Sequence, residues 1–75
     1  MVNGHKNWNH WNVSLWIGND EGLYRLALQC LRECPNRNSA VECLLSELNS
    51  GGITHTPDGA PYTKITIRAA LRGLT

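Results

Sequence analysis

The sequence predicts a small, mainly α-helical single domain, a bundle of three to four short helices within residues 1–75. Three observations lead to this fold class. Apolar residues recur at helical spacing in several segments. Residues that begin or end helices separate those segments. The chain is 41% hydrophobic and 17% charged, and its 75 residues have room for one domain only.

The first predicted helix covers residues 9–17, after a polar lead-in at residues 1–7 that we expect to be flexible. Asn9 is a candidate N-cap, and the apolar residues that follow it fit a wide helical face. Their β-branched and aromatic character would also suit a strand, which remains the alternative. Gly18 is expected to take a left-handed conformation after the helix end.

Three tryptophans, Trp8, Trp11 and Trp16, lie close together in a chain that has no phenylalanine. A buried aromatic side chain removes about 150–250 Å² from water, so we expect this cluster to supply much of the core. Three such side chains exceed what a core of this size encloses. We therefore expect Trp8, the closest to the start of the chain, to be exposed and available for binding.

The second predicted helix begins after Asn19 or Asp20 as its cap and ends before Pro35, because the residue before proline resists helical geometry. Asp20 and Glu21 place negative charge at the positive end of the helix dipole. Its apolar stripe consists of Leu23, Leu26, Ala27, Cys30 and Cys34.

The third predicted helix covers residues 39–48, because Ser39 and Glu42 have the spacing of a capping box and Gly51 and Gly52 follow its end. Its apolar stripe consists of Val41, Leu44, Leu45 and Leu48.

Residues 53–62 predict a short hairpin or a turn, because Pro57 and Gly59 stand at favourable turn positions. The last element has two readings, since the alternation around Ile65 is strand-like. We favour a helix over residues 67–74 with Thr66 as its cap, because residues 69–72 are strong helix formers.

Composition excludes several classes of function. Seven Lys+Arg against six Asp+Glu leave a net charge of +1, which does not favour a mainly electrostatic nucleic-acid binder. No apolar run approaches the roughly 20 residues of a membrane span. No apolar stretch of signal-peptide type follows Met1, so we expect a cytoplasmic protein that does not interact with membranes.

No catalytic, metal or cofactor site is predicted. Cys30, Cys34, Cys43 and His55 could supply four metal ligands, but their spacing differs from that of zinc-binding pairs, and burial of the thiols on helix faces is the simpler interpretation. No local signature marks Cys43 and His55 as a nucleophile and its base. The sequence therefore predicts a protein that is not an enzyme.

The predicted partner-binding surface combines an exposed tryptophan, the acidic start of the second helix and the loop after the third. Its residues are Trp8, Asp20, Glu21, His55, Asp58 and Tyr62.

Two alternatives remain. Lys64, Arg68 and Arg72 lie in a segment without acidic residues, and the two arginines share one helix face, which would suit a small DNA-binding regulator. The third interpretation is a homodimer that buries the tryptophan stripe between two copies.

Residues 7–24 have the pattern Asn-aromatic-x-x-Trp-Asn-Val-x-Leu-Trp-x-x-Asn-Asp-Glu. This opening resembles a family of small proteins of bacteriophages and other mobile elements, and the turn at residues 56–59, followed by Tyr62 and a terminal helix, also resembles that family. Asn9 and His10 stand where its members often carry an acidic residue and threonine. The resemblance implies a phage or mobile-element origin and no particular activity.

Small phage proteins commonly act by binding a host protein, often a defence complex such as CRISPR machinery or a restriction enzyme. By this analogy, we expect a non-enzymatic inhibitor of a host macromolecule, of the anti-CRISPR or anti-restriction type, in the host cytoplasm.

Overall fold

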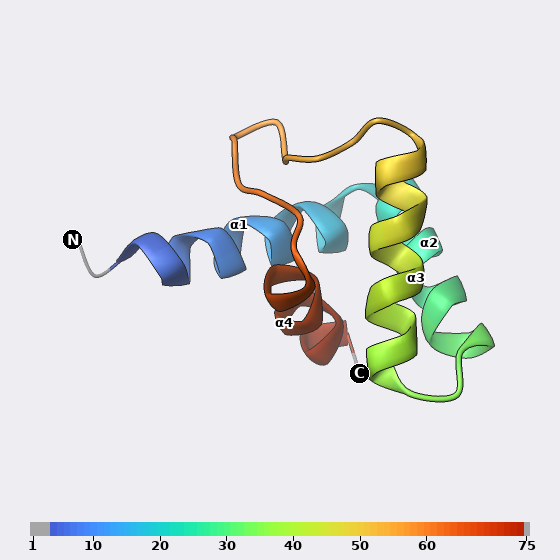
Figure 1. Cartoon of the computed structure of the whole chain (residues 1–75). Helices are drawn as coiled ribbons and strands as arrows, with labels where there is room; N and C mark the ends of the chain where they lie inside the picture. Colours follow the sequence, from blue (N-terminus) through green and yellow to red (C-terminus); the bar gives the residue numbers. More distant parts are fainter. Residues whose placement is uncertain (1–3, 75) are drawn as a thin grey trace.

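The structure is a computed structural model that describes residues 4–74, with side chains described from residue 8 onward (Figure 1). This part of the chain folds into α1 (Gly4–Asn19), α2 (Glu21–Glu33), α3 (Arg37–Ser50) and α4 (Lys64–Leu74). Residues 4–74 form no strand, and the predicted hairpin or turn at residues 53–62 is a turn closed by an isolated bridge between His55 and Pro61. The predicted fold class, a small helical bundle, is confirmed.

The helices pack around one core, in which α4 lies against both α1 and α3 (Figure 1). α2 packs against α1 and α3 on the other side of the bundle. The N-terminal part of α1 extends beyond the other helices, and the long loop after α3 passes back over α1 before it enters α4. No helix in residues 4–74 combines the length and the apolar character needed to cross a bilayer.

α1 is longer than the sequence predicted, because it begins at Gly4 and ends at Asn19. Asn9 is an interior residue and not the N-cap, and residues 4–7 of the predicted lead-in are helical, whereas residues 1–3 lie outside the described residues. No proline interrupts this stretch, and each added helical residue gains a hydrogen bond once a helix has started. The strand alternative for this segment is wrong, and Gly18 continues the helix.

Asp20 alone separates α1 from α2 and caps the second helix, as predicted. Its backbone is extended, and its Oδ1 accepts a hydrogen bond of 3.1 Å from the Leu23 amide. The helix ends at Glu33, before Pro35, again as predicted. Asp20 therefore sets the corner between α1 and α2.

α3 begins two residues earlier than predicted, and its cap is a different residue. The side chain of Asn36 accepts a hydrogen bond of 2.8 Å from the Ser39 amide, so Asn36 is the N-cap and the predicted capping box of Ser39 and Glu42 is wrong. The Glu42 carboxylate instead lies 3.8 Å from the Lys64 ammonium group of α4. An Asn side chain caps a helix at least as well as Ser, which explains the earlier start.

The end of α3 fixes the start of the long loop through a Schellman motif. The amide of Ile53 donates to the Leu48 carbonyl at 2.8 Å, and that of Gly52 donates to the Asn49 carbonyl at 3.0 Å. Gly52 has a φ of 78°, a conformation that a Cβ atom disfavours. A hydrophobic contact commonly accompanies this motif, between the residue after the left-handed glycine, here Ile53, and the residue whose carbonyl it binds, here Leu48.

α4 is a helix, as predicted, but it begins at Lys64 and its cap is not Thr66. Thr63 and Thr66 cap each other: the Thr66 amide donates to Thr63 Oγ1 at 3.2 Å, and the Thr63 amide donates to Thr66 Oγ1 at 2.9 Å. The Thr66 side chain is buried within the first turn, where its hydroxyl also donates to the Pro61 carbonyl at 3.0 Å. The reciprocal arrangement satisfies two amides that a helix start leaves without intrahelical partners.

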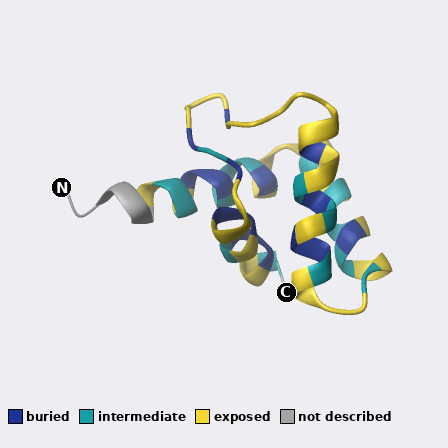
Figure 2. Cartoon of the chain, in the orientation of Figure 1, coloured by how far each residue is buried: buried dark blue, intermediate teal, exposed yellow. Residues whose placement is uncertain are grey.

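The core is aliphatic, and the expectation that the tryptophans supply much of it is wrong. Buried segments of the helices face the middle of the bundle (Figure 2). Trp8 is 41% exposed and Trp11 is 56% exposed, whereas Trp16 is partly buried. The buried apolar residues are Val13, Ile17, Ala27, Cys30, Ala40, Val41, Leu44, Leu48, Ala60, Tyr62, Ile67, Ala70 and Leu71. The inward face of α1 is therefore the one that carries Val13 and Ile17, and the exposure predicted for Trp8 is confirmed.

Candidate protein-binding surface

A polar cluster fastens the long loop to α1. Asp58 Oδ2 accepts hydrogen bonds from Asn12 Nδ2 at 2.9 Å and from Trp16 Nε1 at 3.0 Å. The hydroxyl of Thr56 donates to Asn12 Oδ1 at 2.6 Å and accepts from the Ala60 amide at 3.0 Å. We call these four residues, Asn12, Trp16, Thr56 and Asp58, the loop clasp.

The loop clasp links the two segments of the sequence that stood out, the Trp-rich opening and the turn at residues 56–59, through three hydrogen bonds. The Trp-rich opening supplies Asn12 and Trp16, and the turn at residues 56–59 supplies their partners. The two hydrogen bonds from Asn12 and Trp16 stabilise the carboxylate, so they lower the pKa of Asp58 below its ordinary value of 3.8. Asp58, predicted as a partner-binding residue, is thus an exposed residue that positions the loop.

The loop held in this way forms one wall of an open apolar groove of about 560 Å³. Trp16, at the end of α1, and Leu23 and Leu26, from α2, line one side, and Leu48 at the end of α3 contributes to the floor. The loop contributes Ile53 and Pro57. We call this surface the apolar groove; Asp20, Gly22, Glu47, His55 and Tyr62 complete its lining.

The structure brings three of the six predicted partner-binding residues together in the apolar groove, namely Asp20, His55 and Tyr62. Tyr62 is 6% exposed, so it forms part of the floor and is not the free aromatic that the sequence suggested. Burial, and secondly the charge of Asp20, raise the pKa of the Tyr62 hydroxyl above its ordinary value of 10.0.

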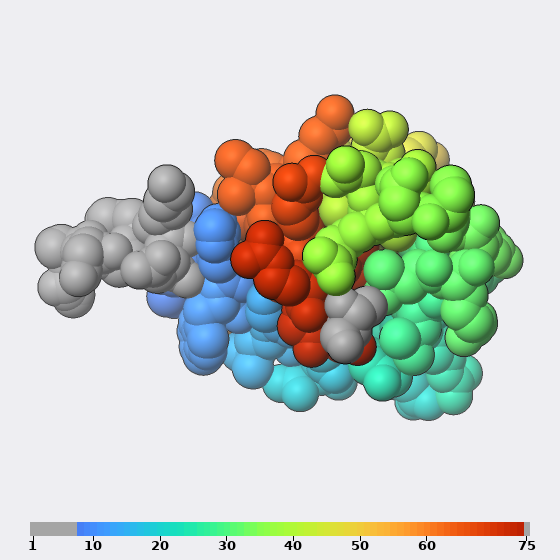
Figure 3. All heavy atoms as spheres, turned by 90° about the horizontal axis from the view of Figure 1, so that it is seen from below, coloured from blue at the N-terminus to red at the C-terminus, as the bar shows by residue number. Residues whose placement is uncertain are grey.

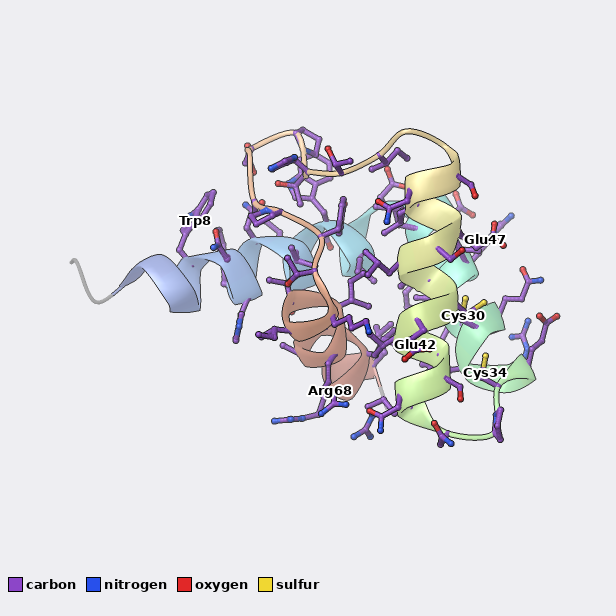
Figure 4. All side chains as sticks on the ribbon, in the orientation of Figure 1. Trp8, Cys30, Cys34, Glu42, Glu47 and Arg68 are labelled. Atoms are coloured by element: carbon purple, nitrogen blue, oxygen red, sulfur yellow. The ribbon has the colours of Figure 1, made fainter. Side chains whose placement is uncertain are left out.

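The other three predicted residues lie outside the groove lining. Glu21 forms an exposed ion pair with Arg25 one turn along α2, and Asp58 belongs to the loop clasp. Trp8 points away from the bundle on the projecting part of α1 (Figure 4). It forms a second exposed aromatic surface with Trp11, separate from the groove.

Sequence reasoning missed the groove residues Trp16, Glu47 and Ile53 as candidates for binding. Ile53 is 42% exposed although it is a large apolar side chain. The order Leu48, Gly52, Ile53 has Schellman spacing, and this signal could have placed Ile53 beside the end of α3. No comparable local signal marks Trp16 or Glu47.

The three basic residues of the alternative surface also lie together. Lys64, Arg68 and Arg72 line a groove of about 610 Å³ with His10 of α1 and residues of α3. Seen from below, α4 lies between α1 and α3 at this face (Figure 3). The charge here is partly compensated, because Lys64 faces Glu42. Arg68 donates a hydrogen bond to the neutral Asn38 side chain and keeps its full charge. We call this surface the basic groove.

The three cysteines are free thiols between α2 and α3 (Figure 4). The Sγ atoms of Cys30 and Cys43 are 3.4 Å apart, and burial, followed by the contact with Cys43, raises the pKa of Cys30 to about 12. Such a thiol is a poor nucleophile at neutral pH. Among the described residues, no group of three or more His, Cys, Asp and Glu side chains is arranged to hold a metal ion.

The sequence analysis considered Cys43 and His55 as a nucleophile and its base. His55 lies in the apolar groove, and the lining of this groove does not include Cys43. Its Nδ1 is 2.9 Å from Thr54 Oγ1. The described residues of the apolar groove thus offer apolar contact area, with the charged side chains of Asp20 and Glu47 beside it.

Comparison with protein families gave one match, over residues 1–72, to the model of a family of unknown function, DUF7249. No curated protein and no solved structure matches the chain.

Proposed function

This chain belongs to DUF7249, a family of unknown function, and we propose that it is a non-enzymatic binding protein that acts by occupying the surface of another protein. The observation that carries the proposal is the apolar groove, in which partly exposed aliphatic and aromatic side chains surround an open space instead of meeting each other in the core. A mostly apolar lining with a few polar and charged groups beside it is typical of binding sites.

The binding energy of such a surface comes from a few large side chains at its centre. Ile53 and Trp16 both line the groove. The Ile53 backbone is tied to the Leu48 carbonyl at the end of α3, and the Trp16 indole nitrogen donates to Asp58. Because the loop clasp holds the wall in place, little ordering is required when a partner binds, which favours affinity.

The partner that we propose is a host protein, in particular a component of a defence complex such as CRISPR machinery or a restriction enzyme, encountered in the host cytoplasm. This part of the proposal rests on the resemblance of residues 7–24 to phage and mobile-element proteins, and on the way that small phage proteins commonly act. The groove itself supports binding to a protein surface.

The test is affinity capture from a bacterial host lysate with the full chain and with an Ile53→Asp variant. Ile53 is partly exposed, so the variant should fold, and far-ultraviolet circular dichroism checks this. We expect a stoichiometric partner with the native chain and a loss of at least tenfold with the variant, since a charge in an apolar hot spot costs about 2 kcal/mol or more. Equal recovery with both chains would count against the groove.

A Trp8→Ala/Trp11→Ala variant tests the second exposed aromatic surface in the same capture. Both side chains are more than one third exposed and lie outside the groove. We expect a smaller loss than with Ile53→Asp; a larger loss would move the binding surface to α1.

The second candidate function is a small DNA-binding regulator, favoured by the placement of Lys64, Arg68 and Arg72 along one groove. Glu42 and the near-neutral net charge weaken this alternative, because phosphate binding depends on an excess of cations. A gel-shift titration with duplex DNA at two salt concentrations decides whether this chain binds DNA through the basic groove. Salt-sensitive binding that an Arg68→Ala/Arg72→Ala variant loses would establish the regulator, whereas we expect none.

A further inference from the structure

We propose that the occupant of the apolar groove is an amphipathic helical segment of the partner protein, with Lys or Arg side chains flanking its apolar anchors. This inference rests on the proposed function and adds the chemistry of the partner. It follows from the charges at the groove, from the lack of a strand edge and from the contrast between the two grooves.

The charges that line the apolar groove are acidic. Asp20 contributes one carboxylate from the corner between α1 and α2, and Glu47 contributes another from α3. No lysine or arginine is among the described residues of the lining. The groove thus has an apolar floor with two carboxylates and one imidazole around it.

These carboxylates are available to a partner. Glu47 of α3 is exposed (Figure 4), and neither of the ion pairs between described side chains includes it. Asp20 uses Oδ1 to cap α2 and keeps Oδ2 for another donor. Lys or Arg beside the apolar anchors would meet both, whereas an acidic segment would be repelled.

The backbone amides and carbonyls of the partner segment are best paired by hydrogen bonds within the segment itself. Recognition by strand addition needs an open sheet edge, and residues 4–74 contain only an isolated bridge. This chain therefore offers side chains and not a ladder of backbone groups. A helix, which pairs its own amides and carbonyls, enters such a site without leaving polar groups unsatisfied.

The basic groove makes the choice between the two grooves more selective for a basic partner segment. It carries Lys64, Arg68 and Arg72 on the face formed by α1, α3 and α4, and Glu42 is the only acidic residue among the described residues of its lining. A basic amphipathic segment is disfavoured there and favoured at the apolar groove. The opposite charges of the two grooves thus direct such a segment to one of them.

The test is a selection from a displayed library of helix-stabilised peptides with randomised surface positions, using the full chain as target and Ile53→Asp as the counter-target. We expect the enriched peptides to carry apolar residues at positions i, i+3 or i+4 and i+7, with Lys and Arg enriched and Asp and Glu depleted.

The matched control is an Asp20→Asn/Glu47→Gln chain. Asn caps helices as well as Asp, so α2 keeps its start while both charges are lost. We expect the selected basic peptides to bind this chain about two- to tenfold more weakly, as the loss of two partly exposed ion pairs predicts. A fresh selection on it should show no preference for Lys and Arg.

Direct binding can be followed by one intrinsic reporter. Trp8→Phe/Trp11→Phe leaves Trp16, in the groove, as the only tryptophan. Its emission should shift on addition of a selected peptide, and an Ile53→Ser variant, which removes apolar area without adding charge, should weaken the response. An unchanged emission at saturating peptide would place the peptide elsewhere and overturn the proposal.

The remaining outcomes separate this inference from the proposed function. Enriched apolar peptides without basic bias would overturn the charge inference but leave a protein-binding groove. An absence of peptides that depend on Ile53 would overturn helix docking, while partner capture that depends on Ile53 would still support the proposed function. A dimeric mass by light scattering that becomes monomeric in Ile53→Asp would show that a second copy fills the groove, and would overturn the inference.

Discussion

Asn12 illustrates how one polar side chain fixes the position of a loop. It is 1% exposed, and a buried amide is unfavourable unless its hydrogen-bonding groups find partners. Thr56 and Asp58 supply those partners from more than 40 residues away in the sequence, and no buried side-chain polar atom of the described residues lacks a partner. The loop is consequently held against α1 by geometry that its own sequence does not specify.

An Asn12→Ala substitution should destabilise the fold by about 1–3 kcal/mol, because it leaves the buried Thr56 hydroxyl without its acceptor and removes one of the two donors to Asp58. Urea unfolding followed by circular dichroism measures the change. Asn49→Ala, at an exposed position of α3, is the matched control and should change the unfolding free energy by less than about 0.5 kcal/mol. Equal effects of the two substitutions would contradict the role of the loop clasp.

The contribution of Asp58 to stability should depend on pH. Its pKa is lowered in the folded state by the hydrogen bonds from Asn12 and Trp16, so the folded state favours the ionised carboxylate. The stabilisation is fully present above the ordinary pKa of 3.8 and is lost as pH falls through the lower folded pKa.

We expect Asp58→Ala to flatten the acid limb of the curve of unfolding free energy against pH below about pH 4. Trp16→Phe, which removes one of the two donors, should give an intermediate slope. Acid limbs that coincide with that of the native chain would show that the pKa shift contributes nothing to stability.

At the scale of the elements, the caps show where local sequence was informative and where it was ambiguous. Asp20 and Pro35 bound α2 as predicted, because each acts through its own backbone and side chain. At the start of α3 the sequence predicted a cap at Ser39, and the structure has Asn36 there instead. Asn36 caps a longer helix and therefore satisfies more backbone amides than a start at Ser39 would.

The observed cap of α3, Asn36, and the capping box expected from the sequence, Ser39 with Glu42, lead to different predictions for stability. Asn36→Ala should cost about 1 kcal/mol of unfolding free energy, within the range of 0.5–2 kcal/mol for the loss of an N-cap. Glu42→Gln should cost less than about 0.5 kcal/mol, because its exposed contact with Lys64 is weak. Chemical denaturation of both variants distinguishes the caps, and the reverse order would restore the capping box of Ser39 and Glu42.

At the scale of the whole molecule, the buried surface and the functional surface use different residues of the same helices. α1 buries Val13 and Ile17 and exposes Trp8 and Trp11, so its largest side chains contribute little to the core. The apolar groove forms where the end of α1, the start of α2, the end of α3 and the loop meet. None of these segments forms the groove alone.

Exposure predicts which large side chains matter for stability. Trp8→Ala and Trp11→Ala should each change the unfolding free energy by less than about 1 kcal/mol, because Trp8 is 41% exposed, Trp11 is 56% exposed and neither belongs to the buried core. Leu44→Ala, at a fully buried position, should cost about 2–5 kcal/mol. Thermal and urea unfolding test this contrast, which a similar loss in all three variants would refute.

Local sequence was sufficient to predict the helical class, the limits of α2, the helical form of the last element and the turn after α3. Each of these features depends on neighbours within a few residues, through side-chain periodicity, capping and the restrictions of proline and glycine. The exposure of Trp8 was also anticipated, from its place near the start of the chain.

Only the tertiary structure decided which face of α1 is buried, which residues form the loop clasp and which residues line the apolar groove. A helical pattern shows which residues share a face, but which face is buried depends on the helices that pack against it. Here α1 packs against α4 and α2 with Val13 and Ile17 buried, and the Trp16 indole donates to Asp58, which is 42 residues away in the sequence. Contacts between distant segments thus determine the binding surface, whereas local contacts determine the helices that carry it.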